Sequence, residues 1–192
     1  MTGARRIIAL AGLSGVGKTT LIHQVIDPRI IVHLSASDLI KNQIKLENEG
    51  DKTSEMLRTG NITNNQDRLV TAFTTIVSSI REHIILDCHT IIDTPVEIQK
   101  ISIEVFRAME ITDFIFLSID PIKLYQRREK DKIRLRPIRT IEEIELQQKI
   151  SLQLARQIAE ALCIPFFEIG SAPEAQLLFI LKSLPLLSRN LS

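Results

Sequence analysis

The sequence predicts an α/β fold in which a parallel sheet of five strands has helices on both faces. One observation is that five short apolar segments are typical of buried strands, namely residues 6–11, 30–34, 83–87, 114–119 and 164–169. The other is that stretches with helical spacing of apolar residues separate these segments. This alternation favours parallel strands joined by helical crossovers, and it places a ligand site at the carboxyl ends of the strands.

The predicted helices are marked by capping residues and apolar stripes. A polar stretch from Glu47 to Thr63 shows little periodicity, so we expect a loop there with one short helical piece. Thr94-Pro95 can open a helix whose apolar stripe runs to Met109, and Thr140 begins a capping box. We expect helices at about 21–26, 39–44, 55–58, 66–80, 95–109, from 121 on, at 141–162 and from 173 on.

The length and charge of the chain are those expected of one well-cored domain. It has 192 residues, 44% of them hydrophobic, and its 24 basic and 23 acidic residues give a net charge of +1. Such a balance excludes global attraction to nucleic acid or to an anionic membrane, so a positively charged site must be local. We expect a single domain over residues 1–192, with no general nucleic-acid surface.

Neither a signal peptide nor a membrane span is predicted. The apolar run after the first six residues is too short for either, and the glycine-rich stretch interrupts it. Cys88 and Cys163 each lie in an apolar stretch and lack the spacing of a zinc site. We therefore expect two buried thiols in a cytoplasmic protein.

The stretch from Gly12 to Thr20 fits G-x-x-x-x-G-K-[ST], the pattern that wraps the phosphates of a nucleotide. Its glycines permit backbone angles that point several N–H groups at an anion, and the following helix adds the positive end of its dipole. An apolar strand before the stretch and a helix after it complete the context of a three-layer P-loop NTPase fold. We expect phosphate contacts from Gly12, Ser14, Gly15, Val16, Gly17, Lys18, Thr19 and Thr20.

Two residues are candidate ligands of Mg²⁺, which would accompany ATP. The hydroxyl of Thr19 belongs to the P-loop pattern, and Asp87 ends an apolar strand, as expected of a carboxylate that holds the ion directly or through water. The alternative for Asp87 is a turn or helix-capping residue.

A dense basic segment at residues 127–139 is a candidate lid. It holds seven lysines and arginines against Glu129 and Asp131. Guanidinium groups over a P-loop would stabilise the negative charge of a phosphoryl group in transfer, although a run of charge is often only a solvated surface. We take Lys18, Arg127, Arg134 and Arg136 as the candidate catalytic residues.

Polar residues after the second strand are candidates for an acceptor site opposite ATP, within a segment at about 35–65. They are Ser35, Ser37, Asp38, Lys41 and Arg58. Helix caps and exposed charges would explain them equally well.

At these residues the chain resembles the P-loop nucleoside monophosphate kinases, and most closely the short-lid archaeal type of adenylate kinase. Residues 85–89 are similar to the family's strand ending in Asp-Thr-His, and residues 127–136 are similar to its lid. Leu57-Arg58 resembles the stretch whose arginine contacts the phosphate of the acceptor, and residues 33–41 resemble His-Ile-Ser-Thr-Gly-Asp-Met-Leu-Arg. The chain also resembles a nuclear adenylate-kinase-like ATPase group with a role in ribosome assembly.

The resemblance implies an ATP-dependent enzyme. Lid arginines that match Arg127, Arg134 and Arg136 contact phosphates and cover the adenine in that family. The acceptor contacts implied here are Ser37, Asp38, Lys41 and Arg58, to which we add His89. Two departures stand out: Ala36, Ser37 and Lys41 replace threonine, glycine and arginine of the pattern, and the family's Gly/Pro-rich segment is missing after Thr94-Pro95.

Three functions remain open at this point. The first is transfer of the γ-phosphoryl group of ATP to a nucleoside monophosphate, most readily AMP. The second is phosphorylation of a hydroxyl on a nucleoside or small metabolite, where Asp38 would act as base or hydroxyl ligand. The third is an ATP-dependent switch or assembly ATPase whose lid is read by a partner.

Overall fold

A five-stranded parallel sheet forms the centre of the computed structural model, which describes residues 5–47, 50–134 and 136–184. The N-terminal residues 1–4 and Leu135 of the expected lid lie outside this description. The strand order is β2-β3-β1-β6-β7, and every pair is parallel. The strands are β1 (Ile7–Ala11), β2 (Ile31–Ser35), β3 (His83–Asp87), β6 (Asp113–Leu117) and β7 (Phe166–Ile169). The predicted strands are thus confirmed.

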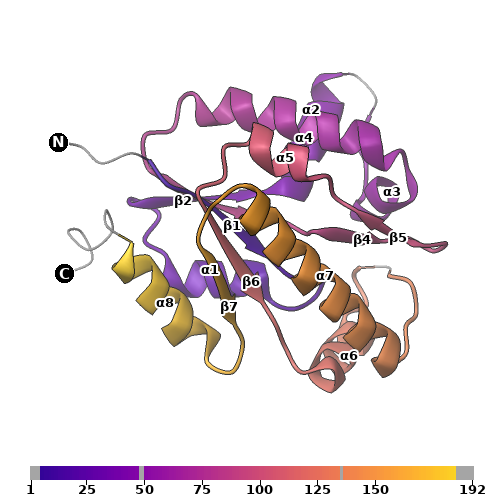
Figure 1. The fold of residues 1–192 in the computed structure, drawn as a ribbon. Coiled ribbons are helices and arrows are strands. Elements are labelled where there is room, and N and C mark those ends of the chain that lie inside the picture. Colours follow the sequence, from indigo (N-terminus) through magenta and orange to yellow (C-terminus); the bar gives the residue numbers. More distant parts are fainter. Residues whose placement is uncertain (1–4, 48–49, 135, 185–192) are drawn as a thin grey trace.

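Helices cover both faces of the sheet and make the fold three layers thick (Figure 1). Alternate residues of β1 point to opposite layers: Ile8 and Leu10 pack with α1 and α8, whereas Ile7 and Ala9 pack with α2, α4, α5 and α7. The helices are α1 (Lys18–Val25), α2 (Ala36–Leu46), α3 (Ser54–Thr59), α4 (Ile62–Val77), α5 (Ile103–Ala108), α6 (Pro121–Lys130), α7 (Ile141–Ala161) and α8 (Pro173–Ser183).

Side-chain caps set where several helices begin. The capping box of α7 forms as predicted: Thr140 Oγ1 accepts from Glu143 N, and Glu143 Oε2 accepts from Thr140 N. Asp120 caps α6 ahead of Pro121. Asn61 accepts from Asn64 N, so α4 begins one turn earlier than the apolar stripe alone predicts.

The prediction that a helix begins at Thr94-Pro95 is wrong. Instead β4 (Ile91–Asp93) and β5 (Ile98–Lys100) form an antiparallel hairpin, and α5 begins only at Ile103. The turn is closed locally, because Thr94 Oγ1 donates to Glu97 O at 2.6 Å and accepts from Glu97 N at 3.0 Å. Such a side-chain-to-backbone turn competes with helix at this position, and Pro95 suits its second residue.

Two burial expectations also need correction. Cys88 is buried as predicted, but Cys163 is exposed. Cys163 has a φ of 54°, in the turn that ends α7, and this turn directs it away from the apolar stripe. Ile76, expected on the inner face of α4, is 39% exposed because that face is narrower than the sequence stripe.

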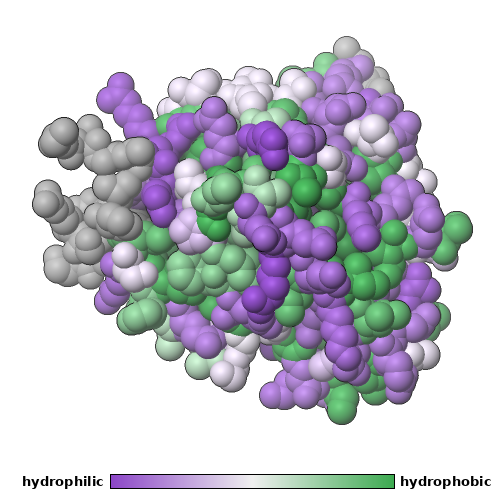
Figure 2. All heavy atoms as spheres, in the orientation of Figure 1, coloured by the Kyte–Doolittle hydropathy of each residue, from purple (hydrophilic) through white to green (hydrophobic). Residues whose placement is uncertain are grey.

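Among the described residues, no helix is both long and apolar enough to cross a membrane. The face that carries α7 shows hydrophilic and hydrophobic side chains interspersed (Figure 2).

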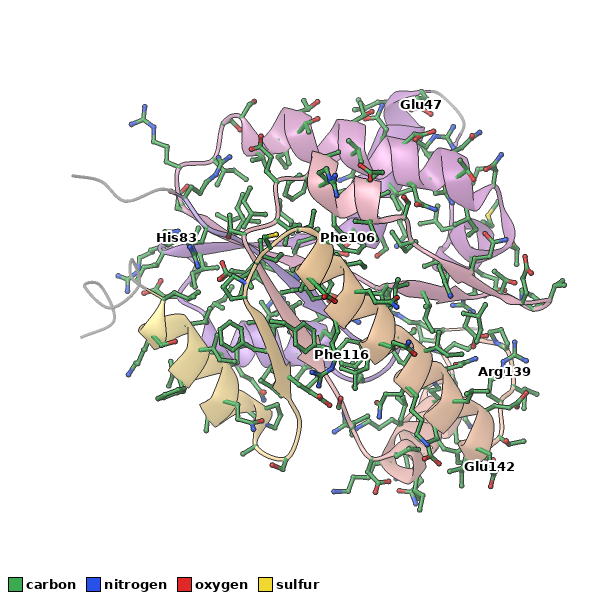
Figure 3. All side chains as sticks on the ribbon, viewed as in Figure 1. Glu47, His83, Phe106, Phe116, Arg139 and Glu142 are labelled. Atoms are coloured by element: carbon green, nitrogen blue, oxygen red, sulfur yellow. The ribbon has the colours of Figure 1, made fainter. Side chains whose placement is uncertain are left out.

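A core phenylalanine and an exposed one provide a matched test of this packing. Phe116 on β6 is fully buried, and Figure 3 shows it in the interior, whereas Phe179 on α8 is 74% exposed. We expect Phe116→Ala to lower the free energy of unfolding by about 3–5 kcal/mol and Phe179→Ala to change it by less than about 0.5 kcal/mol. Urea unfolding followed by circular dichroism measures both, and equal destabilisation would contradict the described core.

Candidate functional site

The loop between β1 and α1 has the backbone geometry of an anion-binding nest. Gly12, Gly15 and Gly17 have positive φ values of 153°, 89° and 102°. A Cβ at Gly12 would lie 2.7 Å from Leu117 O, so the close approach of β6 requires glycine there. Gly17 is the N-cap of α1 and provides no side-chain cap, which leaves the first N–H groups of that helix for a ligand.

The ammonium group of Lys18 lies buried beneath this loop, with three partners. Its Nζ donates to Gly12 O at 3.1 Å and lies 3.2 Å from His89 Nε2 and 3.5 Å from Asp87 Oδ1. Because an ammonium group can only donate, His89 must accept with Nε2 and carry its proton on Nδ1. A bound phosphate would therefore have to replace one of these partners.

The protonation of the neighbouring groups follows from burial and from Lys18. Burial, and then the charge of Lys18, lower the pKa of His89 from 6.5 to about 3, so His89 is neutral. Burial raises the pKa of Asp87, but the charge of Lys18 and the hydrogen bond from Thr19 outweigh this effect. The net pKa of Asp87 lies below its ordinary value, and its carboxylate is charged.

Thr19 and Asp87, the two expected Mg²⁺ ligands, meet at this point. Thr19 Oγ1 donates to Asp87 Oδ2 at 2.6 Å. In the part of the chain that the structure describes, no group of three or more His, Cys, Asp or Glu could hold a metal by itself. One hydroxyl and one carboxylate fit Mg²⁺ that takes its other ligands from nucleotide phosphates and water. A Mg²⁺ site here would thus depend on a bound nucleotide.

Helix α6 and the segment after it lie against the loop through arginines. Arg127 Nη1 donates to Val16 O at 2.7 Å, Arg128 Nε to Ser14 O at 3.0 Å, and Arg136 Nε to Ser14 Oγ at 3.2 Å. Arg136 also pairs with Asp131 at 2.7 Å. The basic segment is therefore closed over the glycine-rich loop.

Two of these arginines retain unused donors. Arg128 Nη1 and Arg136 Nη1 are buried and have no hydrogen-bond partner among the described residues. Burial lowers the pKa of Arg128 to about 10, although the negative charge of Asp93 raises this pKa and so offsets part of the effect. Buried donors of this kind favour an anion as their partner. Arg128 belongs to the basic run, but nothing in the sequence distinguished it from its neighbours.

The end of the basic segment is fixed to the β4–β5 hairpin. Arg139 donates to Asp93 Oδ1 from Nε at 3.1 Å and from Nη2 at 3.0 Å, and Nη2 also donates to Thr94 O at 3.0 Å. Figure 3 shows Arg139 in the segment between α6 and α7, on the side of the molecule where this hairpin lies.

A cavity of about 820 Å³ lies on one side of the glycine-rich loop. It runs between α1, the start of α6 and the turn between β7 and α8. Its lining includes the expected phosphate-binding residues Gly15, Val16, Gly17 and Thr20, together with Arg127.

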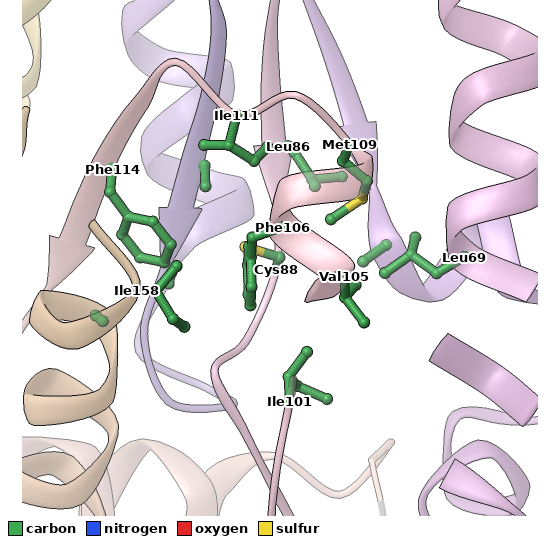
Figure 4. Packing of buried hydrophobic residues seen from close by; sticks show 14 of the residues in the cluster. Leu69, Leu86, Cys88, Ile101, Val105, Phe106, Met109, Ile111, Phe114 and Ile158 are labelled. Carbon is green, nitrogen blue, oxygen red and sulfur yellow. The ribbon is translucent and has the colours of Figure 1, made fainter. Parts of the chain in front are cut away.

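A smaller cavity of about 160 Å³ lies on the other side of the loop, among α2, α3, α4, the hairpin and the basic segment. Of the expected site residues, Ser14, Ser37, Arg58, His89, Arg134 and Arg136 line it. Its inner wall is apolar and belongs to the core (Figure 4), namely Leu69, Cys88, Ile101, Val105, Phe106 and Met109. This volume is close to that of a cavity of about 150 Å³ that holds one benzene ring.

Not every expected acceptor residue lies in this cavity. Asp38 and Lys41 line neither cavity and instead pair with each other at 3.3 Å, with the side chain of Asp38 65% exposed. Four other expected residues line neither cavity: Gly12, Lys18 and Thr19 of the loop and the start of α1, and Asp87 at the end of β3. Sequence reasoning missed Asn65 and Gln66 of α4, which line the smaller cavity.

Comparisons with known proteins agree with this arrangement. The family model described as AAA domain matches residues 11–145. An adenylate kinase from Methanothermobacter thermautotrophicus is 24% identical over 156 residues, which cover 80% of this chain and 84% of that protein.

Solved structures share the fold at low identity. The crystal structure of shikimate kinase from Bacteroides thetaiotaomicron has a TM-score of 0.53 and 15% identity, and covers 94% of this chain and 98% of that one. The crystal structure of a gluconokinase from Sinorhizobium meliloti 1021 has a TM-score of 0.51 and 16% identity, and covers 97% of this chain and 94% of that one.

The neutral state of His89 predicts a pH dependence of stability. Its pKa is about 3 in the folded protein against an ordinary 6.5, so the unfolded chain binds more protons between these values. The neutral imidazole of His89 therefore makes its full contribution to the free energy of unfolding above pH 6.5. As the pH falls below this value, the contribution decreases by up to about 1.4 kcal/mol per pH unit.

His89→Gln is the matched variant, because its amide oxygen can still accept from Lys18 and does not titrate. Without nucleotide or Mg²⁺, we expect the wild-type free energy of unfolding to fall more steeply than that of the variant between about pH 7.5 and about pH 5. Urea unfolding at each pH measures the two curves, and parallel curves would show that His89 is not held neutral.

Proposed function

Because the chain belongs to the AAA domain family, whose P-loop implies ATP binding, we propose that it is an ATP-dependent kinase of a nucleoside monophosphate, with AMP as the first candidate. The resemblance of its strand, lid and acceptor segments to archaeal adenylate kinases supports this proposal. So does the 24% identical adenylate kinase, which aligns over most of both chains.

One observation carries the proposal: two cavities meet at the P-loop, and the smaller one combines arginines with an apolar wall. Arg58, Arg134 and Arg136 line this cavity, and Arg58 and Arg136 have side chains only 12% and 7% exposed. Guanidinium groups suit a phosphate on the acceptor, since they bind it with paired hydrogen bonds. The apolar wall suits a flat ring, whereas a polyhydroxylated acceptor would leave buried hydroxyls without partners.

The larger cavity is the proposed site for the base and ribose of ATP. Its phosphates would lie on the N–H groups of the loop, and Lys18 would exchange one of its present partners for the outer phosphates. Thr19 and Asp87 would hold Mg²⁺, which would neutralise charge on the β- and γ-phosphates. The lid at about 127–139 and the acceptor segment at about 35–65 remain parts of this proposal.

A phosphate acceptor is already an anion, so the reaction needs positioning and charge stabilisation rather than a general base. Arg127, which lines the larger cavity, and Arg128, which lines the smaller one, both donate hydrogen bonds to the loop. Arg136 donates a hydrogen bond to the side chain of Ser14. Closed in this way, the lid would exclude water and so suppress hydrolysis of ATP.

The second candidate is a kinase of a small-molecule hydroxyl. It is favoured by the two solved structures of similar fold, a shikimate kinase and a gluconokinase, both named for hydroxylated acids. An alcohol must lose a proton, and Asp38 was the expected base. Its position outside the smaller cavity, paired with Lys41, gives this candidate less support.

The primary test measures ADP formation from ATP and Mg²⁺ with a panel of nucleoside monophosphates, nucleosides, shikimate, gluconate and no acceptor. We expect a monophosphate to stimulate ADP formation, and Lys18→Ala to lose at least about a hundredfold in rate, since it removes a charge at the transferring group. ADP formation that no acceptor stimulates would instead favour an ATP-dependent switch.

Asp38→Asn separates the two kinase candidates. If the acceptor is a phosphate, we expect little change in kcat, because Asp38 is exposed and no proton must be removed. If the acceptor is a hydroxyl and Asp38 is the base, kcat should fall by about 10²–10⁴ with ATP binding intact. Steady-state kinetics with the best acceptor of the panel, together with calorimetric titration of ATP, distinguish these outcomes.

A further inference from the structure

Two consecutive amide side chains on α4 line the smaller cavity, and each is held by a backbone group. Asn65 Nδ2 donates to Leu57 O at 2.9 Å, and Gln66 Oε1 accepts from Ser102 N at 3.1 Å. The first partner lies in α3 and the second is the residue that caps α5. Neither amide is therefore free to rotate without losing a hydrogen bond.

These partners decide which end of each amide is left over. A backbone carbonyl can only accept and a backbone N–H can only donate, so the oxygen and nitrogen of both amides are assigned without ambiguity. What remains is Asn65 Oδ1 as an acceptor and Gln66 Nε2 as a donor. Within the described ranges, neither atom has another hydrogen-bond partner in the protein.

The rest of the cavity determines what these two atoms can meet. Apolar core residues form its inner wall, and arginines form the part next to the P-loop. In such a cavity a few fixed polar atoms set the orientation and identity of the ligand, because any polar group facing apolar wall would go unpaired. A ligand with its anion on the arginines would bring a ring to the wall that carries Asn65 and Gln66.

We propose that Asn65 and Gln66 read the base of the acceptor nucleotide and select bases with an amino group, adenine and cytosine, over guanine and uracil. This inference rests on the proposed nucleoside monophosphate kinase. Adenine has an amino donor beside the ring acceptor N1, and cytosine has an amino donor beside the ring acceptor N3. In either base the amino group could donate to Asn65 Oδ1 while the ring nitrogen accepts from Gln66 Nε2. Bound in the same orientation, guanine and uracil present the reverse order, a carbonyl beside a ring N–H, and would face like with like.

The test replaces one atom, Nε2 of Gln66, and measures the change in preference between AMP and GMP. Gln66→Glu keeps an oxygen for Ser102 N but replaces the remaining donor by an acceptor, so the wall presents two acceptors. Guanine carries two adjacent donors, its N1–H and its amino group, and fits that pattern. At about pH 8, which favours the ionised carboxylate, we expect kcat/KM for AMP to fall by about tenfold or more and that for GMP to rise.

Gln153→Glu on α7 is the matched control, since it makes the same change at an exposed position that lines neither cavity. We expect it to leave the ranking of acceptors unchanged. Gln66→Ala is the second variant: it should weaken AMP and CMP, mainly through KM, without any gain for GMP. Circular dichroism and calorimetric titration of ATP verify that each variant is folded and loads the donor.

The outcomes separate this inference from the proposed function. A wild-type preference of about tenfold or more for AMP and CMP over GMP and UMP, shifted toward GMP only in Gln66→Glu, supports the inference. Equal use of all four monophosphates, or an unchanged ranking in Gln66→Glu, overturns the reading of the base and leaves a nucleoside monophosphate kinase standing. Failure of every monophosphate to stimulate ADP formation overturns both.

Discussion

The buried ammonium group of Lys18 is the charge around which the site is arranged. It is 5% exposed and reaches Gly12 O, His89 Nε2 and Asp87 Oδ1. A buried cation is costly unless it is paired and hydrogen-bonded, so the chain must bring these three groups together. The glycine-rich loop provides the carbonyl, and the end of β3 provides the carboxylate and the imidazole. The parallel pairing of β1 with β3 therefore underlies the chemistry of the site as well as the sheet.

Much of the fold could be predicted from the sequence because its signals are local. Each strand of the central sheet is a short apolar run, and Thr140 with Glu143 marks the start of α7. The hairpin of β4 and β5 could not be predicted in this way. Apolar residues from Ile98 to Met109 recur at a spacing that suits a helix, yet the hydrogen bonds between Thr94 and Glu97 favour a turn. A competition between two local structures cannot be decided from apolar spacing alone.

The same distinction applies to the site. The loop residues, Thr19 and Asp87 could be chosen from a motif and a strand end, and the structure brings Thr19 and Asp87 within 2.6 Å. Asn65 and Gln66 had no such signal, since their significance depends on backbone partners in other segments. Arg128 is likewise one basic residue among seven, and it stands out only because its buried Nη1 has no hydrogen-bond partner within the described part of the chain. Residues whose function depends on long-range contacts are those that a single sequence conceals.

Arg127 and Arg128 are neighbours on α6, yet one lines the larger cavity and the other the smaller. Successive residues of a helix differ in direction by about 100°, and the helix moves as one body. A substitution that shifts α6 to enlarge one cavity would therefore displace the arginine of the other. Helix α4, by contrast, contributes side chains to the smaller cavity and none to the larger one within the described residues. The smaller cavity can thus be changed separately from α4, whereas a shift of α6 changes both cavities together.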